Sequence, residues 1–248
     1  MPSFLHSLAS PARFNRIATR VLPWAWVLAA GLIGTGLVWA LVFVPPDYQQ
    51  GDTVRVMFIH VPSAWMAMFC YAVMAVLSAS FLIWKHQLAD LAARAAAPIG
   101  ACFTAAALIT GSLWGKPTWG TYWVWDARLT SVLVLFFLYL GHMALVSVFD
   151  DRERGGRAAA ILAVVGAINL PIIKFSVDWW NTLHQPASVL RMDGPTIHSS
   201  MLWPLLIMAL GFTAFFVAIH LVRIRSELTA RRIEVLLRRQ AALGAGPS

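Results

Sequence analysis

The chain has 248 residues, of which 59% are hydrophobic and only 12% are charged, and its formal net charge at pH 7 is +8. Soluble domains carry about 25% charged residues, and a water-soluble chain of this size cannot bury so large a share of apolar side chains in its core. The composition therefore excludes a soluble enzyme, a DNA-binding protein and a disordered scaffold. It predicts that lipid surrounds much of the chain.

Six segments have the length and composition of membrane-spanning helices, each of which needs about 20 mostly apolar residues. The fifth is short, and we expect Pro171 and Lys174 to make its outer end irregular. The first follows three arginines but is longer than the core of a signal peptide, so it is expected to be an uncleaved anchor. The sequence predicts an all-α integral membrane protein that is a single six-span domain over residues 1–248, with spans at about 21–44, 63–84, 95–114, 129–149, 158–175 and 201–222.

The basic residues predict the orientation of these spans. If the N-terminus is cytoplasmic and the spans alternate, 14 of the 19 Lys and Arg residues are cytoplasmic, many of them in a basic tail at residues 223–248. This asymmetry favours an N-in, C-in topology. The excess positive charge then lies beside acidic lipid, which argues against a nucleic-acid partner. The outer face keeps only Arg55, Lys116, Arg128, Lys174 and Arg191.

The two cysteines, Cys70 and Cys102, each lie in an apolar stretch, and the chain has no CxxC or CxxCH motif. The sequence therefore encodes neither a thiol–disulfide motif nor a covalent haem attachment site. We expect both cysteines to be buried packing residues.

A tryptophan-rich segment at residues 114–130 lies between the third and fourth spans. Tryptophan and tyrosine also gather at membrane interfaces, so an interfacial belt is one interpretation. The density of aromatic residues favours the other, a shelf for a flat apolar ligand. If residues 119–126 form a short helix, Trp119, Trp123 and Asp126 lie on one face of it. The aromatic and acidic candidates are Trp114, Trp119, Trp123, Trp125 and Asp126.

The other two outer segments each contribute a histidine, His60 and His184. A lone interfacial histidine is usually a helix cap or a solvated side chain, but two that flank an aromatic segment on one membrane face are harder to explain in this way. Imidazole is a strong ligand of haem iron, which makes both residues candidates, with His198 in reserve. His142 lies inside the fourth span, where we expect it to be hydrogen-bonded to a neighbour.

The run WGKPTWGTYWVWDARLTS resembles the signature of the tryptophan-rich WWD family, which handles haem in cytochrome c maturation. The resemblance extends through FIHVPSAWM and WWNTLHQPASV and covers about residues 10–225. It implies a bacterial inner-membrane protein that binds haem b at its periplasmic face and presents it to the haem chaperone CcmE. The implied partners are the ABC transporter subunits CcmA and CcmB and the small membrane protein CcmD. The resemblance also implies that His60 and His184 are the axial ligands and that the tryptophan segment holds the haem edge.

Three more outer residues have candidate roles. Haem propionates need cations, and Arg55 and Arg128 are the nearest to His60 and to the tryptophan segment. A guanidinium binds a carboxylate through two hydrogen bonds, although these cations could instead contact lipid phosphates. Asp126 directly precedes the fourth span, so it is expected to cap that helix or to order an indole N–H, which can only donate.

The sequence has no GxxxxGK[ST] motif and no evident catalytic acid or base, so we expect a cofactor-binding protein and not an enzyme. A transmembrane haem permease is one alternative, but intramembrane charges mark transport paths, and the predicted spans contain none apart from Lys174 at the outer end of the fifth. A b-type electron-transfer subunit is another. That class would place paired histidines within the spans, whereas His60 and His184 lie at their outer edges.

Overall fold

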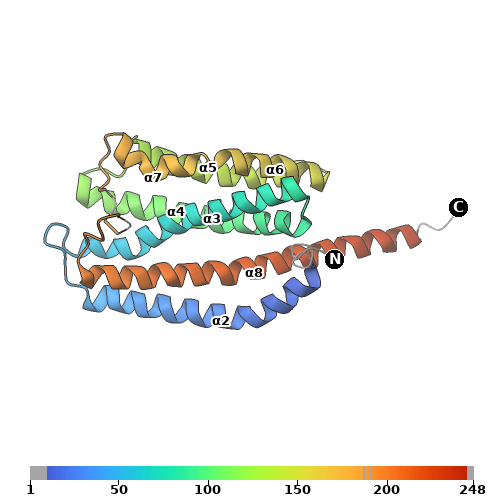
Figure 1. Ribbon diagram of the computed structural model, residues 1–248, viewed down its shortest axis with the longest axis horizontal. Coiled ribbons are helices and arrows are strands. Elements are labelled where there is room, and N and C mark those ends of the chain that lie inside the picture. Colours follow the sequence, from blue (N-terminus) through green and yellow to red (C-terminus); the bar gives the residue numbers. More distant parts are fainter. Residues whose placement is uncertain (1–9, 187, 190, 245–248) are drawn as a thin grey trace.

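The computed structural model describes residues 10–186, 188–189 and 191–244, and helices dominate that part of the chain (Figure 1). The helix α2 continues directly into the π-helical turn η1, and the short 3-10 helix η2 leads into α3. The bounds in chain order are α2 Pro11–Val38, η1 Trp39–Phe43, η2 Asp52–Val56, α3 Met57–Trp84, α4 Gln87–Trp119, α5 Ala127–Val148, α6 Arg152–Gly166, α7 Asn169–Trp179 and α8 Ser199–Gly244.

Within the described residues, six helical segments are long and apolar enough to cross a membrane, which confirms the predicted six-span, all-α membrane protein. The fifth segment consists of α6 and α7, separated by a turn at residues 167–168. This break comes earlier than predicted. Pro171 lies in the first turn of α7, where a missing backbone N–H costs no helical hydrogen bond, and the helix continues through Lys174 to Trp179.

The helices lie side by side along the long axis of the molecule (Figure 1). α2 packs beside α8 on one side, α5 to α7 lie on the other, and α3 and α4 lie between them. The 46 residues of α8 correspond to roughly 69 Å at about 1.5 Å per residue, about twice the thickness of a bilayer core. The sixth span and most of the basic tail are therefore one helix, which projects beyond the others (Figure 1).

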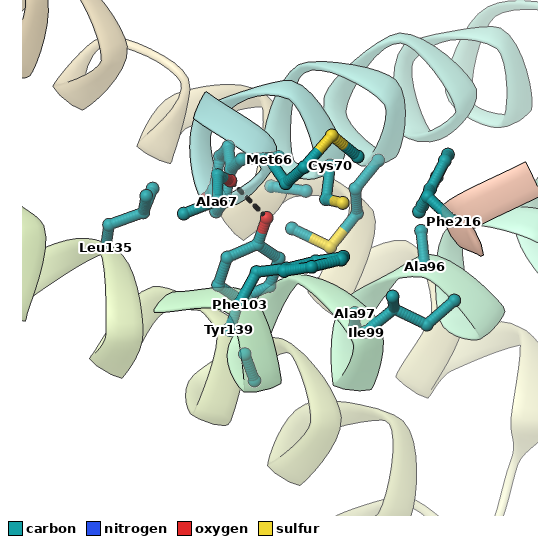
Figure 2. Packing of buried hydrophobic residues seen from close by; sticks show 14 of the residues in the cluster. Met66, Ala67, Cys70, Ala96, Ala97, Ile99, Phe103, Leu135, Tyr139 and Phe216 are labelled. Atoms are coloured by element: carbon teal, nitrogen blue, oxygen red, sulfur yellow. Dashed lines mark hydrogen bonds between the residues drawn. The ribbon is translucent and has the colours of Figure 1, made fainter. Parts of the chain in front are cut away.

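Small residues allow the central helices to approach closely, as is usual where lipid gives no hydrophobic drive between helices. The buried face of α4 is rich in alanine. Gly100 of α4 lies against the ring of Tyr139, and a Cβ at Gly100 would be only 2.1 Å from that side chain. The Tyr139 hydroxyl donates a hydrogen bond to the Ala67 carbonyl of α3 at 2.8 Å (Figure 2). One tyrosine thus connects α3, α4 and α5 in the core.

The two cysteines differ in their surroundings. Cys70 is fully buried in the central cluster shown in Figure 2, as predicted. Cys102 is exposed on the outer surface of α4, so its predicted burial is wrong. Positions on a helix alternate between its inner and outer faces, which explains why the two cysteines differ. The sequence does not reveal which face is outer, because a helix surrounded by lipid is apolar on both faces.

Candidate functional site

The loops at residues 45–51 and 120–126 and the described loop residues 180–186, 188–189 and 191–198 gather at one end of the bundle, which we call the loop end (Figure 1). α4 ends there at Trp119 and α5 begins at Ala127, while η2 and the first turn of α3 bring in His60. The chain after α7 brings in His184. Segments far apart in the sequence therefore meet at this end.

One face of α4 holds the His60 ring. The His60 and Trp114 rings meet edge to face, with centroids 5.6 Å apart. Gly111 gives the imidazole its space, because a Cβ there would lie 2.7 Å from His60 Cε1. Thr110 Oγ1 lies 3.1 Å from His60 Nδ1. Residues 110, 111 and 114 lie one turn apart or less, so a single helical face positions this histidine.

The hydrogen bonds of Thr110 determine which nitrogen of His60 carries the proton. A hydroxyl has one proton to donate, and Thr110 donates it to the Ala106 carbonyl at 2.6 Å. The hydroxyl oxygen must then accept from His60, so Nδ1 is the protonated nitrogen. Neutral imidazole has one donor and one acceptor nitrogen. In this tautomer Nε2 of His60 carries the lone pair and is the nitrogen that can act as a ligand.

A glycine ends α4 and turns the chain back across the loop end. Gly120 has a φ of +77° and its N–H bonds to the Lys116 carbonyl at 3.0 Å, the usual left-handed termination that glycine favours. The Ser112 hydroxyl then donates to the Tyr122 carbonyl at 2.9 Å, which holds the returning segment against α4. Residues 120–126 are irregular. The conditional prediction of a short helix over residues 119–126 is therefore wrong.

Asp126 connects the tryptophan segment to the loop after α7. Its Oδ1 accepts from the Leu129 N–H at 2.7 Å, which confirms the predicted N-cap of α5. Its Oδ2 accepts a short hydrogen bond from the Thr182 hydroxyl, and His184 Nδ1 lies 3.6 Å from the same oxygen. The second role is thus to order Thr182 and His184. No bond from Asp126 to an indole is present among the described residues.

His184 packs against Trp119, with ring centroids 4.8 Å apart. Burial lowers the pKa of His184 below its ordinary value of 6.5; the nearby carboxylate of Asp126 opposes this shift and the guanidinium of Arg128 adds to it. The ring is therefore neutral at pH 7, the state in which imidazole binds iron. Its buried Nδ1 makes no hydrogen bond within the usual distance among the described residues, but it faces the Asp126 carboxylate at 3.6 Å, which leaves Nε2 as the nitrogen on the other side of the ring.

The two histidines lie at the loop end and contact tryptophans that are five residues apart on α4. α4 supports both, through Trp114 against His60 and Trp119 against His184. The structure thus brings together the two residues that the sequence predicts as ligands, together with two of the four predicted tryptophans.

The other two tryptophans extend this surface outward. Trp123 and Trp125 meet edge to face at 5.5 Å; the Trp123 indole N–H is buried without a partner among the described residues, and Trp125 is 77% exposed. Trp179 and Trp180 at the end of α7 are also at least half exposed. Exposed aromatic side chains at one end of a membrane bundle fit both interpretations given above, an interfacial belt and a binding surface.

The two predicted propionate cations already have protein partners. The Arg55 guanidinium pairs with Asp52 at 3.0 Å and donates to the Leu41 carbonyl at the end of α2–η1. Arg128 donates to the Ser176 hydroxyl at 3.0 Å and to the Ile173 carbonyl at 3.2 Å. Arg128 therefore ties α5 to α7, which helps to place the chain that carries His184. Arg55 instead connects the first loop to the first span.

The contacts of two other histidines, His198 and His142, differ from those that the sequence predicts. His198, the reserve ligand, accepts from the Ser200 N–H at the start of α8, in the manner of a helix cap. His142 is 2% exposed, and its Nδ1 has no partner among the described residues. The hydrogen bond to a neighbour that the sequence predicts for His142 is therefore not made by Nδ1.

Sequence reasoning missed four supporting residues: Thr110, Gly111, Thr182 and Gln50, whose side-chain carbonyl accepts from the Trp114 indole at 2.9 Å. A small residue at 111 and a hydroxyl at 110, one turn before Trp114, were the available signals. These signals indicate a histidine-binding face only once α3 is known to lie against this face of α4.

The fold and this end of it define a class: a multi-pass membrane protein that offers two neutral imidazoles and an exposed aromatic surface at one side of the bundle. The comparisons with known proteins then identify the family. The sequence model of heme exporter protein C, CcmC, matches residues 4–239, and the chain belongs to this family.

Several relatives cover nearly all of the chain. Heme exporter protein C of Bradyrhizobium diazoefficiens is 58% identical over 238 residues, which is 96% of this chain and 90% of the relative. The Haemophilus influenzae protein of the same name is 49% identical over 228 residues, 92% of this chain and 93% of the relative. That of Escherichia coli K12 is 47% identical over 223 residues, 90% and 89% respectively.

Proposed function

We propose that this chain binds haem at the loop end and hands it on during cytochrome c maturation. The observation that carries the proposal is the pair of neutral histidines, each held by a tryptophan of α4 and each next to one polar side chain. Haem is a flat, mostly apolar disc, which suits an aromatic surface. Two imidazoles match an iron whose four equatorial positions are filled by porphyrin nitrogens.

Within this proposal, Nε2 of each histidine is the iron ligand. Thr110 fixes the proton of His60 on Nδ1. The Asp126 carboxylate lies beside Nδ1 of His184 at 3.6 Å, slightly longer than a hydrogen bond, and would hold the proton there when the ring tightens on its ligand. Such second contacts orient a ligating histidine and raise its basicity.

The aromatic residues and cations then hold the rest of the cargo, haem b. Trp114 and Trp119 back the histidines, and Trp123 and Trp125 offer a surface for the edge of the disc. Arg128 is the preferred propionate partner, because it lies two residues after Asp126, whose carboxylate faces His184. Arg55 remains the second candidate.

The distribution of Lys and Arg supports a periplasmic loop end in the bacterial inner membrane, with both termini in the cytoplasm. On that side the haem chaperone CcmE is the proposed recipient, and CcmA, CcmB and CcmD are the proposed neighbours in the membrane. The role is binding and hand-over, not catalysis. Release requires that the affinity for haem be limited, since each additional 1.4 kcal/mol or so of binding free energy shifts the hand-over equilibrium about tenfold toward the haem-bound chain.

Crosslinking tests the direction of hand-over. A photo-crosslinker at Gly120 or Gln185, both exposed at the loop end, is expected to capture CcmE. The same group at His86 or Arg154, at the opposite end, is the matched control and is expected not to capture it. Efficient capture only from the control positions, at equal membrane levels, would overturn the proposed orientation.

Replacing Gly111 by alanine is expected to weaken haem binding by about tenfold, or ~1.4 kcal/mol. The added Cβ would lie 2.7 Å from His60 Cε1 and must displace the ring. Haem content per protein, measured by absorbance, checks this. Gly31→Ala is the control, because a Cβ at Gly31 meets nothing within 4 Å. Equal haem content in Gly111→Ala and wild type would show that the position of the ring does not matter.

A further inference from the structure

A cavity of about 320 Å³ lies at the end of the bundle opposite the loop end. It is lined by α4, α5, α6 and α8, and most of its polar lining is cationic. The charged and polar residues on its wall are Arg94, His142, Arg152, Arg223 and Glu227. We propose that this cavity binds the phosphate group of an anionic phospholipid.

Two groups on the wall lack the partners that buried polar atoms require. His142 is 2% exposed, and its Nδ1 has no hydrogen-bond partner among the described residues. The buried Nε of Arg223 has none either. Such atoms are rare in native proteins and call for a ligand, a water or an ion. A guanidinium can only donate hydrogen bonds, so the missing partner of Arg223 is an acceptor.

The ion pairs around the cavity do not neutralise all of its positive charge. Asp90 is shared by two guanidiniums, with Arg94 Nε at 3.0 Å and Arg231 Nη2 at 2.9 Å. Arg152 pairs with Glu234 at 3.3 Å. Arg223 has no ion pair with any residue that the structure describes.

Arg94, Arg152, Arg223 and Glu227 line the cavity. Together with their ion-pair partners Asp90 and Glu234, and with Arg231, which shares Asp90, the group holds four guanidiniums and three carboxylates. With His142 neutral, one positive charge is in excess. A phosphodiester carries one negative charge and several strong acceptor oxygens, so it matches both the charge and the missing acceptor. A buried site that is balanced in this way avoids the cost of an unpaired charge.

The apolar part of the lining favours a lipid over free phosphate. Pro98 lies one turn further into the bundle than Arg94 on α4, whereas Met143 and Val146 lie between His142 and the end of α5. The cavity wall therefore combines a cationic part with an apolar part made of Pro98, Met143 and Val146. Basic pockets between membrane-spanning helices bind lipid head groups, and the apolar part suits the start of an acyl chain.

The test uses the purified full-length chain in an uncharged detergent, with the melting temperature followed as phosphatidylglycerol, phosphatidylcholine or inorganic phosphate is added. Phosphatidylglycerol is expected to raise the melting temperature, and the other two are not. Arg223→Gln is expected to weaken the affinity for phosphatidylglycerol about tenfold, or ~1.4 kcal/mol, so that about ten times more lipid is needed for the same rise in melting temperature. Arg225→Gln removes an exposed cation two residues along the same helix and should leave the response unchanged.

A further variant keeps the proposal testable if Arg223→Gln does not fold. Glu227→Gln removes a negative charge from the wall and is expected to tighten the binding of phosphatidylglycerol severalfold. An equal response to phosphatidylcholine, or an equal loss in Arg225→Gln and Arg223→Gln, would overturn the proposal, because either result indicates a non-specific effect. A full response to inorganic phosphate alone would overturn the assignment to a lipid.

Discussion

Replacing both His60 and His184 by alanine is expected to abolish haem retention, and either single change is expected to weaken it at least about tenfold, or ~1.4 kcal/mol. Each imidazole is oriented by its own tryptophan and its own polar neighbour. Losing one ring removes one axial ligand, whereas losing both leaves only aromatic contacts, each worth about 0.5–1.5 kcal/mol beyond burial. Haem per protein, measured after purification, checks the prediction.

His198→Ala is the matched control, because this histidine also lies at the loop end but accepts from the Ser200 N–H at the start of α8. It is expected to retain haem with an unchanged axial-ligand spectrum. Full haem content in both His60→Ala and His184→Ala, with folding verified independently, would refute the assignment of the ligands.

Replacing Asp126 by alanine is expected to have the second largest effect, because one carboxylate has three neighbours. It caps α5 through the Leu129 N–H, accepts from the Thr182 hydroxyl and lies beside His184 Nδ1. Loss of a cap costs about 0.5–2 kcal/mol. Haem binding should fall about tenfold as well, or ~1.4 kcal/mol, since Thr182 and His184 lose their common anchor.

Asp126→Asn separates the two effects. The amide oxygen can still accept from Leu129, so the melting temperature should stay near that of the wild type while haem binding falls. Protonation cannot explain that fall: the carboxylate raises the pKa of His184, so its removal lowers that pKa further and keeps the ring neutral. If haem affinity and melting temperature change together in both Asp126→Ala and Asp126→Asn, Asp126 acts only as a helix cap.

The six spans could be predicted from the sequence because a bilayer imposes a length and a composition on each of them. The turn at residues 167–168 could not, since an apolar helix and an apolar turn have similar hydropathy. The same limitation explains the error at Cys102, whose exposed side is as apolar as its buried side.

The placement of both histidines at one end of the bundle could be predicted, because each lies next to the outer end of a predicted span on the same side as the tryptophan segment. Their support could not. The role of Gly111 depends on the packing of α3 against α4, and the tautomer of His60 depends on where the single proton of Thr110 goes. The irregular course of residues 120–126 follows from the left-handed Gly120, which a helical pattern through the tryptophans does not reveal.

The absorption spectrum of the purified chain, expressed alone in cells that make haem, tests the central claim most directly. With His60 and His184 both bound to iron, the spectrum should be that of a low-spin, bis-imidazole haem, and it should change when either histidine is replaced. A colourless protein, or a haem spectrum that stays the same when both histidines are replaced, would contradict the account.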